Sequence, residues 1–407
     1  MKVYSYSDKI MFKGGWVAPP TERQCGKNFV TEERVKEIAE CGINLMHIDC
    51  SREEFANARK FVEYGVKYGV CYILSLGNTL SEDFSAEAIK EELEYYNGFD
   101  NVIGYNLCDE PGMNSFPALA STAKKLRPYI GDKVIYINHM PMYATTSQLQ
   151  GGWWSPYESA ASTGDYYDFL DKFFETVDND IVSYDFYPFR HEKGGTDFRY
   201  FDQLCVAKRI SEKYDKPFWN FTQVTSWNRD VVRNMTYSEL AWLNNTSLAC
   251  GVTCLQYFCY WTPADGVENF LSAMISRDGH KTRHYYFAKD LNQKVDAISP
   301  YLLSATHKGV IPYGDTLAAY PTEYALTSFG NIKSYMSDGM IIGCFEREGK
   351  NMYYLVNTSV LETRVLELYF NKDISAEVII GTEKTEFTGS EIIRPIAPGE
   401  GMLIVEK

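Results

Sequence analysis

Short apolar segments recur along the first three quarters of the chain, at intervals of about 25 to 45 residues. Between them lie stretches with apolar residues at positions i, i+3 and i+4, such as residues 31–42 and 52–69, and both of these finish at a glycine. Strands that alternate with amphipathic helices predict parallel βα units. The eight predicted strands are residues 11–19, 42–49, 70–76, 101–110, 133–141, 180–188, 217–227 and 251–261.

Eight βα units within about 290 residues predict a closed (β/α)8 TIM barrel. A doubly wound open sheet is the weaker alternative, because no glycine-rich nucleotide-binding turn follows any predicted strand. The pattern changes near residues 303–312, after which strand-like segments alternate with turns and show no helical period. The alternating pattern of this final segment therefore predicts a β-sandwich. We expect the barrel over residues 1–305 and an accessory β-sandwich domain over residues 306–407.

The composition narrows the range of partners. Apolar residues make up 45% of the chain, and the net charge is −14. This acidic balance disfavours nucleic acid and anionic lipid and favours neutral substrates. The sequence shows neither a membrane span nor the apolar core of a secretion signal. Most of the ten cysteines lie in predicted strands and helices, as buried small residues do. We expect a cytoplasmic location, or secretion if a signal peptide has been removed; a homo-oligomer remains open.

The segment from Asn101 to Gly112 gives the strongest indication of an active site. Its strand ends in two adjacent acids, Asp109 and Glu110, and a proline and a glycine follow. In barrel enzymes the carboxyl ends of the strands surround one crevice, where the chemistry takes place. The other predicted strand ends supply further carboxylates, amides and aromatic rings: Trp16, Asp49, Asn138, His139, Asp185, Tyr187, Gln223, Trp227 and Trp261.

This set of side chains suits carbohydrate chemistry. Sugars have C–H faces that stack on aromatic rings, and hydroxyl groups that bind carboxylates and amides. Cleavage of a glycosidic bond requires a carboxylic acid that protonates the leaving oxygen, and usually a second carboxylate. The six scattered histidines form no metal-binding pattern, and we expect no cofactor. The catalytic candidates are Glu110, Asp109 and Asp185, and the substrate-binding candidates are Trp16, Asn138, His139, Tyr187, Gln223, Trp227 and Trp261.

Each candidate also has a structural interpretation. Glu110 could cap the helix that follows it, and Asp109 or Asp185 could make a structural hydrogen bond. We assign Glu239 to such a role, because residues 236–239 fit a capping box at the start of a helix. Trp153 and Trp154 could form a platform for a sugar. His139 and His191 could act as general bases or as hydrogen-bonded residues of the scaffold.

Five motifs point to a family of enzymes. They are GGWVAPP, GYNLCDEP, SYDFYPF, YFCYWTP and, in the last helix of the barrel, SRDGHKTRHYYFAKDLNQKV. Over about residues 10–300 the chain resembles the (β/α)8 glycoside hydrolases of the cellulase and β-galactosidase clan. That clan carries an Asn-Glu pair at the end of strand four, with the glutamate as acid/base. The resemblance implies that Glu110 is the acid/base and that Asp109 replaces the asparagine that contacts the sugar 2-substituent.

The chain departs from that clan on strand seven. The clan has a nucleophilic glutamate there, whereas segment 217–227 offers only the amide of Gln223. An amide does not attack an anomeric carbon as a carboxylate does. One hypothesis makes Asp185 the second carboxylate: as a nucleophile it would lie roughly 5 Å from Glu110, and as an inverting base roughly 6.5 to 9.5 Å away.

Two other hypotheses need no carboxylate nucleophile. The substrate's own acetamido oxygen could act as the nucleophile, with Asp109 orienting the acetamido group and Tyr187 bonding its oxygen. Alternatively, the barrel has lost hydrolysis and only binds glycans. We favour glycoside hydrolysis with Glu110 as the proton donor. An adjacent Asp109 charge and a partly dry pocket would raise the pKa of Glu110, as a general acid requires.

Overall fold

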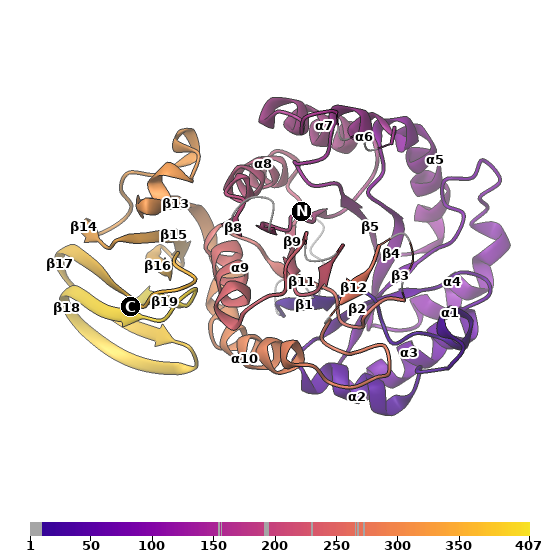
Figure 1. Ribbon diagram of the computed structural model, residues 1–407, viewed down its shortest axis with the longest axis horizontal. Coiled ribbons are helices and arrows are strands. Elements are labelled where there is room, and N and C mark those ends of the chain that lie inside the picture. Colours follow the sequence, from indigo (N-terminus) through magenta and orange to yellow (C-terminus); the bar gives the residue numbers. More distant parts are fainter. Residues whose placement is uncertain are drawn as a thin grey trace.

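The computed structural model describes residues 10–407 except 154, 156, 191–194, 229, 230, 265, 267 and 272. Eight parallel strands close into a barrel in the order β1-β11-β9-β6-β5-β4-β3-β2 (Figure 1). Each coincides with one of the strands that the hydrophobic pattern predicts. They are β1 (Phe12–Gly15), β2 (Leu45–Asp49), β3 (Cys71–Ser75), β4 (Val102–Asp109), β5 (Val134–His139), β6 (Val182–Tyr184), β9 (Phe218–Gln223) and β11 (Cys254–Phe258).

Helices surround the barrel, and local signals set where several of them begin and end. The side chain of Thr31 accepts a hydrogen bond from the Arg34 backbone at the start of α2, and Gly69, with φ of 70°, ends α3. The predicted capping box of Thr236 and Glu239 is present at α9. The helices are α1 (Glu22–Cys25), α2 (Glu32–Glu40), α3 (Phe55–Tyr68), α4 (Lys90–Asn97), α5 (Phe116–Leu126), α6 (Thr146–Gln150), α7 (Thr163–Thr176), α8 (Arg199–Tyr214), α9 (Tyr237–Ala249) and α10 (Arg283–Leu303).

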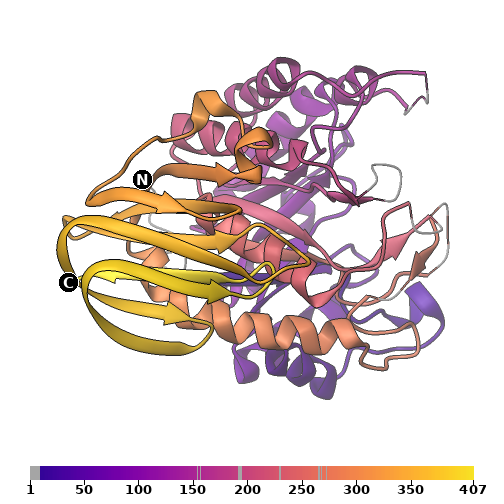
Figure 2. The same cartoon turned by 60° about the vertical axis from the view of Figure 1, so that its left-hand side comes forward.

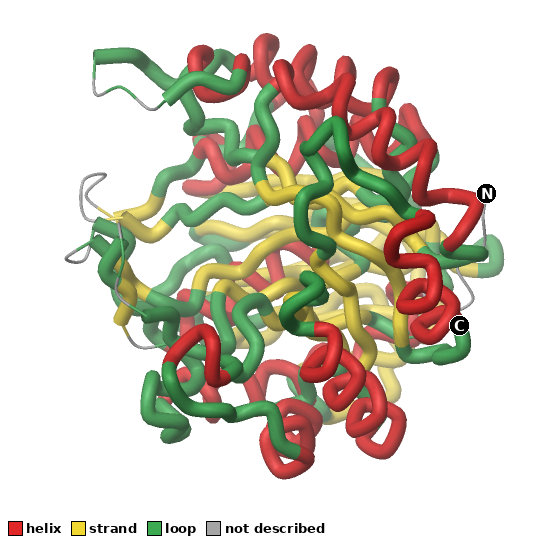
Figure 3. The backbone as a smooth tube through the Cα atoms, turned by 90° about the vertical axis from the view of Figure 1, so that its right-hand side faces the viewer, coloured by secondary structure: helices red, strands yellow, loops and turns green. Residues whose placement is uncertain are grey.

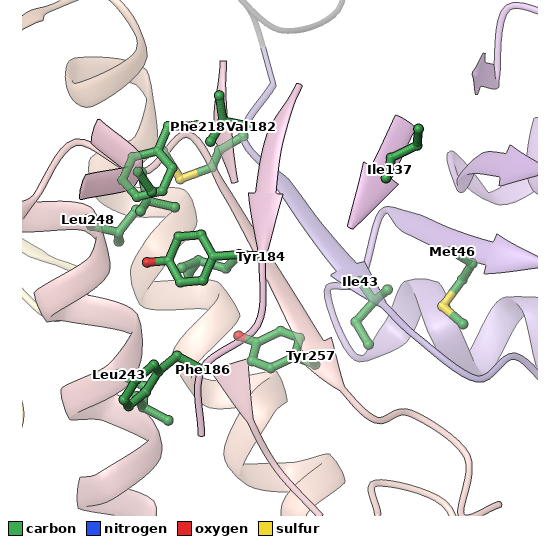
Figure 4. Close-up of a cluster of buried hydrophobic side chains, with 14 of the residues drawn as sticks. Ile43, Met46, Ile137, Val182, Tyr184, Phe186, Phe218, Leu243, Leu248 and Tyr257 are labelled. Carbon is green, nitrogen blue, oxygen red and sulfur yellow. The ribbon is translucent and has the colours of Figure 1, made fainter. Parts of the chain in front are cut away.

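Side chains of the barrel strands alternate between two cores. In β3, Tyr72 and Leu74 pack in the large core that contains the buried faces of the helices, whereas Ile73 packs in a separate core with Tyr136 and Trp219 of other strands. Figure 3 shows the strands enclosed by helices, and Figure 4 shows part of the large core. This alternation leaves the strand ends as the positions where polar side chains can face a cavity.

Two short antiparallel pairs follow barrel strands. β7 (Phe189–Arg190) pairs with β8 (Gly195–Thr196), and β10 (Ser226–Trp227) pairs with β12 (Phe270–Leu271). The second pair connects the segment after β9 to the segment after β11. These connections fix the walls of the barrel mouth on that side.

The C-terminal part is antiparallel and forms a β-sandwich-like domain with its own core (Figure 2). Its strand order is β13-β15-β16-β19-β17-β14, with β18 paired to β17. The long strand β17 pairs with β14 through its first half and with β19 through its second half, so the sheet curls around its core. The strands are β13 (Thr306–Gly314), β14 (Ile332–Met336), β15 (Gly339–Arg347), β16 (Lys350–Asn357), β17 (Arg364–Ile380), β18 (Glu383–Ile396) and β19 (Gly401–Glu406).

Helix α9 joins the two domains. The Tyr354 hydroxyl donates to Asn245 Oδ1 at 2.7 Å, and the Asn245 amide donates to the Gly399 carbonyl at 2.8 Å. The Trp242 indole donates to the Thr358 carbonyl at 3.1 Å. Every residue of α9 from Glu239 to Ala249 is buried, because one face packs on the barrel and the other on the sandwich. Among the described residues, none of the helices has the length and apolar character needed to cross a membrane.

Candidate active site

A cleft of about 1170 Å³ opens at the carboxyl ends of β4, β5, β6, β9 and β11. It brings together the three catalytic candidates with four of the substrate-binding candidates. The residues that meet there are Asp109, Glu110 and Asp185 with Trp16, Asn138, Tyr187 and Trp227.

The two adjacent acids owe their accessibility to the way β4 ends. Asp109 is the last residue of the strand, and Glu110 adopts φ of 47°, in the left-handed region. The Glu110 backbone N–H donates to the Asn138 carbonyl at 2.9 Å, which holds this turn against β5. Both side chains are exposed to the cleft. A non-glycine residue held in this conformation is uncommon, and such conformations cluster at functional sites.

Asn138, at the end of β5, connects two of the acids. Its amide nitrogen donates to Asp109 Oδ1 at 3.2 Å and to Asp185 Oδ1 at 3.4 Å. Its Oδ1 accepts a hydrogen bond from Ser183 at 3.0 Å, which fixes the orientation of the amide. Asn138 therefore holds the two carboxylates on one wall of the cleft.

Glu110 and Asp185 are joined directly by a hydrogen bond between their carboxyl groups, and Tyr187 also bonds Asp185. Desolvation raises the pKa of Glu110 well above its ordinary value, and the charges of Asp185 and Asp109 raise it further. Desolvation also raises the pKa of Asp185 to about 7 and that of Asp109 to about 6. The hydrogen bond between them raises the pKa of Glu110 and lowers that of Asp185, so the Glu110 carboxyl is the donor and Asp185 is the acceptor.

This contact decides what Asp185 is able to do. Hydrogen-bonded carboxyl oxygens lie about 2.5 to 3.0 Å apart. A retaining pair needs roughly 5 Å between its carboxyl groups and an inverting pair at least roughly 6.5 Å, since the scissile bond lies between them. Asp185 is thus beside Glu110 and not opposite it. The hydrogen bond suits Asp185 to holding the proton of Glu110; its role as a nucleophile or inverting base stays a prediction.

Gln223 and His139 are predicted substrate-binding residues that the structure places outside the cleft. Gln223 is fully buried: its Oε1 accepts from the Phe189 backbone N–H at 3.2 Å, and its amide donates to the Phe189 and Arg233 carbonyls at 3.1 Å each. His139 is fully buried with its ring 4.2 Å from that of Phe173, and desolvation lowers the pKa of this histidine to about 3. Both expectations are corrected, because these side chains serve the scaffold.

Aromatic rings form another part of the cleft wall. Tyr187 packs edge-on against Trp227 with ring centroids 5.0 Å apart, and Phe258 lies 5.6 Å from Tyr187. Trp261 does not line this cleft but a neighbouring cavity, together with Asp49 and Trp16. Trp153 is 94% exposed, and Trp154 and His191 lie outside the described residues.

Several residues of the cleft escaped the sequence analysis, among them Tyr143, Arg190 and Glu268. Arg190 lies over the ring of Tyr143, with 5.0 Å between the guanidinium carbon and the ring centroid. Glu268 is exposed, accepts a hydrogen bond from the Asn228 amide at 3.4 Å, and contributes to raising the pKa of Glu110. All three lie beyond the ends of the barrel strands. Among them, only Glu268 had a signal in the sequence, because this acid follows the eighth predicted strand closely enough to reach the barrel mouth.

The chain matches a family model described as β-galactosidase, of glycoside hydrolase family 42, over residues 154–298. This match covers β6, β9 and β11, which form one side of the cleft. The protein is a glycoside hydrolase. The comparison with curated protein sequences gave no match.

Solved structures share the fold of this hydrolase at low identity. The β-galactosidase from Bacillus circulans sp. alkalophilus is 9% identical with a TM-score of 0.63, over 97% of this chain and 99% of that one. The β-galactosidase from the psychrophilic Marinomonas ef1 is 10% identical with a TM-score of 0.51, over 72% of this chain and 62% of that one. These similarities support the barrel fold, and the first extends through the C-terminal domain.

Proposed function

We propose that this glycoside hydrolase cleaves the glycoside of a 2-acetamido-2-deoxy sugar, with Glu110 as general acid/base and the substrate's acetamido oxygen as nucleophile. One observation carries the proposal. Asp109, Glu110 and Asp185 lie on one wall of the cleft in a single hydrogen-bonded group, whereas the strand-seven position holds the amide of Gln223, which is bonded to the scaffold. A mechanism in which the substrate supplies the nucleophile needs no carboxylate there.

In the first step, Glu110 gives its proton to the glycosidic oxygen. The bond between the anomeric carbon and this oxygen breaks while the acetamido oxygen bonds to the anomeric carbon, and the leaving group departs as an alcohol. The resulting five-membered ring carries a positive charge on the former amide. Asp109, as a carboxylate, accepts the N–H of this amide and stabilises the charge. Tyr187 is the second candidate for contact with the acetamido group.

In the second step, the Glu110 carboxylate takes a proton from water. The water oxygen bonds to the anomeric carbon, the five-membered ring opens, and the product keeps the configuration of the substrate. Asp185 is a positioning residue, because its hydrogen bond holds the carboxyl of Glu110 in place. Its charge also keeps the pKa of Glu110 high enough for the first step.

The test compares 4-nitrophenyl β-glycosides of galactose and glucose with those of N-acetylgalactosamine and N-acetylglucosamine. We expect turnover of a 2-acetamido substrate, with the β-anomer appearing first by NMR. Asp109→Asn is expected to lower kcat by about 100-fold, because the charge at the amide loses its partner. Equal turnover of the 2-hydroxy glycosides would contradict acetamido participation. No turnover of any glycoside, together with measurable sugar binding, would favour a barrel that only binds glycans.

Glu268 supports a second candidate function. It lines the same cleft as Glu110, on the loop that follows β11, and its charge acts on that of Glu110. A water activated by Glu268 would hydrolyse a 2-hydroxy glycoside such as a β-galactoside with inversion. In this case the α-anomer would appear first, and Glu268→Gln would abolish turnover. Under acetamido participation, Glu268→Gln changes kcat less than about 5-fold, since the side chain contributes only part of the electrostatic environment.

A further inference from the structure

A second cavity, of about 770 Å³, opens at the same end of the barrel as the catalytic cleft. Strand-end residues of β2 and the segments after β1 and β11 line it, including Trp16, Asp49 and Trp261. None of the three predicted catalytic residues reaches this cavity. Its volume lies in the range of cavities that bind small organic ligands.

Trp16 lies at the boundary, since it lines both the catalytic cleft and the second cavity. Its ring is held between His47, with centroids 4.5 Å apart, and Phe221, at 5.5 Å. His47 is itself fixed by a hydrogen bond of 2.9 Å to Gln256 Oε1. The two cavities therefore meet at one indole ring whose position is set by the barrel interior.

The second cavity has the surfaces that a pyranose ring requires. Most of its exposed wall is carbon, and the buried rings of Phe29 and Trp261, whose centroids are 4.7 Å apart, lie behind that wall. Polar groups stand among these rings: the carboxylate of Asp49 and the amides of Gln24 and Asn57. The partly exposed ring of Trp16 beside carboxylate and amide groups matches the C–H face and the hydroxyl groups of a neutral sugar.

The barrel order tells which part of a substrate this cavity receives. β11 lies opposite β4, with three strands between them on either side. Glu110, at the end of β4, must protonate the oxygen of the leaving group, so the leaving group lies on the β4 side. A sugar unit across the mouth, near β1, β2 and β11, belongs to the other side of the cleaved residue, which is the non-reducing side.

We propose that the second cavity is a saccharide subsite for the unit on the non-reducing side of the cleaved sugar, so that the hydrolase releases a disaccharide or a longer product. This inference rests on the proposed function only in taking Glu110 as the proton donor. It makes the substrate an oligosaccharide and the cleavage internal, instead of the removal of single terminal sugars.

The test fills the cavity without removing a packing residue. Ala18 is half-buried and lines the cavity, Ala264 lines it at the exposed rim, and the exposed Ala88 lies outside it. The probes are 4-nitrophenyl N-acetyl-β-D-glucosaminide and 4-nitrophenyl N,N′-diacetyl-β-chitobioside. We expect the wild type to prefer the disaccharide probe, and Ala18→Trp and Ala264→Trp to lower its kcat/KM by about 30-fold while the monosaccharide probe changes less than 3-fold. Ala88→Trp is the matched control.

A binding measurement separates the subsite from the chemistry. Isothermal titration with N,N′-diacetylchitobiose and galactobiose uses Glu110→Gln, with and without Ala264→Trp. Disaccharide binding that Ala264→Trp removes and Ala88→Trp keeps supports the subsite, even if no probe is hydrolysed and the proposed function fails. Hydrolysis of both probes with equal kcat/KM, unchanged in the filled variants, overturns the subsite and leaves the proposed function intact. Absence of binding of both disaccharides also overturns it.

Discussion

The two halves of the barrel mouth differ in how their residues are held. On the β4 to β6 side, Asp109, Glu110 and Asp185 form one hydrogen-bonded group, in which the charges of Asp185 and Asp109 raise the pKa of Glu110. On the β1, β2 and β11 side, aromatic rings surround a cavity in which Asp49 makes a local hydrogen bond, its Oδ1 accepting from the Ser51 backbone N–H at 2.8 Å. One half is suited to moving a proton, and the other to shape recognition.

The difference shows that an acid at a strand end is not sufficient for chemistry. Asp49 and Asp109 are both the last residues of barrel strands. Only Asp109 lies beside other carboxyl groups, because Asn138 of the adjacent strand and the left-handed turn at Glu110 gather them. Desolvation raises the pKa of Asp109, and the charges of Asp185 and Asp109 add to desolvation in raising that of Glu110.

Removal of the proposed proton donor, Glu110, should have the largest effect. We expect Glu110→Gln to lower kcat by about 1000-fold on a substrate with a poor leaving group, because an amide gives no proton to the glycosidic oxygen. The loss should shrink for a 2,4-dinitrophenyl glycoside, whose leaving group needs little protonation. Glu158→Gln is the control, since Glu158 lines the same cleft but bonds Ser147. Equal losses in both variants would remove the special role of Glu110.

Asp185→Asn should have the next largest effect, lowering kcat by about 10- to 100-fold. As the proposed acid, Glu110 must be protonated to act, and the negative charge of Asp185 raises the pKa of Glu110. Without this charge the pKa falls, so the alkaline limb of the kcat profile should move to lower pH. Profiles of kcat against pH for both proteins check this shift. An unchanged alkaline limb would show that Asp185 does not tune the proton donor.

Gln223→Glu tests the end of β9, which lies between the two halves of the barrel mouth. In the clan that the sequence resembles, a nucleophilic glutamate occupies this position. We expect no gain in activity and a loss of about 2 to 4 kcal/mol in the free energy of unfolding. A glutamate would place an oxygen against the carbonyls of Phe189 and Arg233, which now accept hydrogen bonds from the amide. Denaturant unfolding measures the loss. A stable variant with increased turnover would mean that this position reaches the substrate.

The smallest expected effect is a pH-dependent change in the free energy of unfolding of Asp185→Asn. Because burial raises the folded-state pKa of Asp185 to about 7, the folded protein binds this proton more tightly than the unfolded chain does. The contribution of Asp185 to stability is therefore favourable at low pH and is lost as pH rises from about 4 to about 7. Asp185→Asn should be more stable than the wild type at pH 8 by about 1 to 3 kcal/mol, and this advantage should disappear near pH 4. Thermal unfolding at both pH values checks it.

Much of the fold could be predicted from the sequence. All eight barrel strands, the helices α2 and α3 and the capping box at Glu239 follow from local patterns of apolar residues and helix-start signals. Helix α9 shows the limit of this approach. It has apolar and polar residues all round yet is buried from Glu239 to Ala249, since the C-terminal domain covers the face that would otherwise meet water.

The sequence by itself determined the period of the strands, the acid pair at the end of β4 and the lack of an acid at Gln223. These features depend on residues close together in the chain. Tertiary structure alone decided that Asp185 bonds Glu110, that Gln223 and His139 belong to the scaffold, and that Trp16 separates two cavities. Each of these depends on residues far apart in the sequence, whose side chains meet only when the barrel closes and sets the register between neighbouring strands.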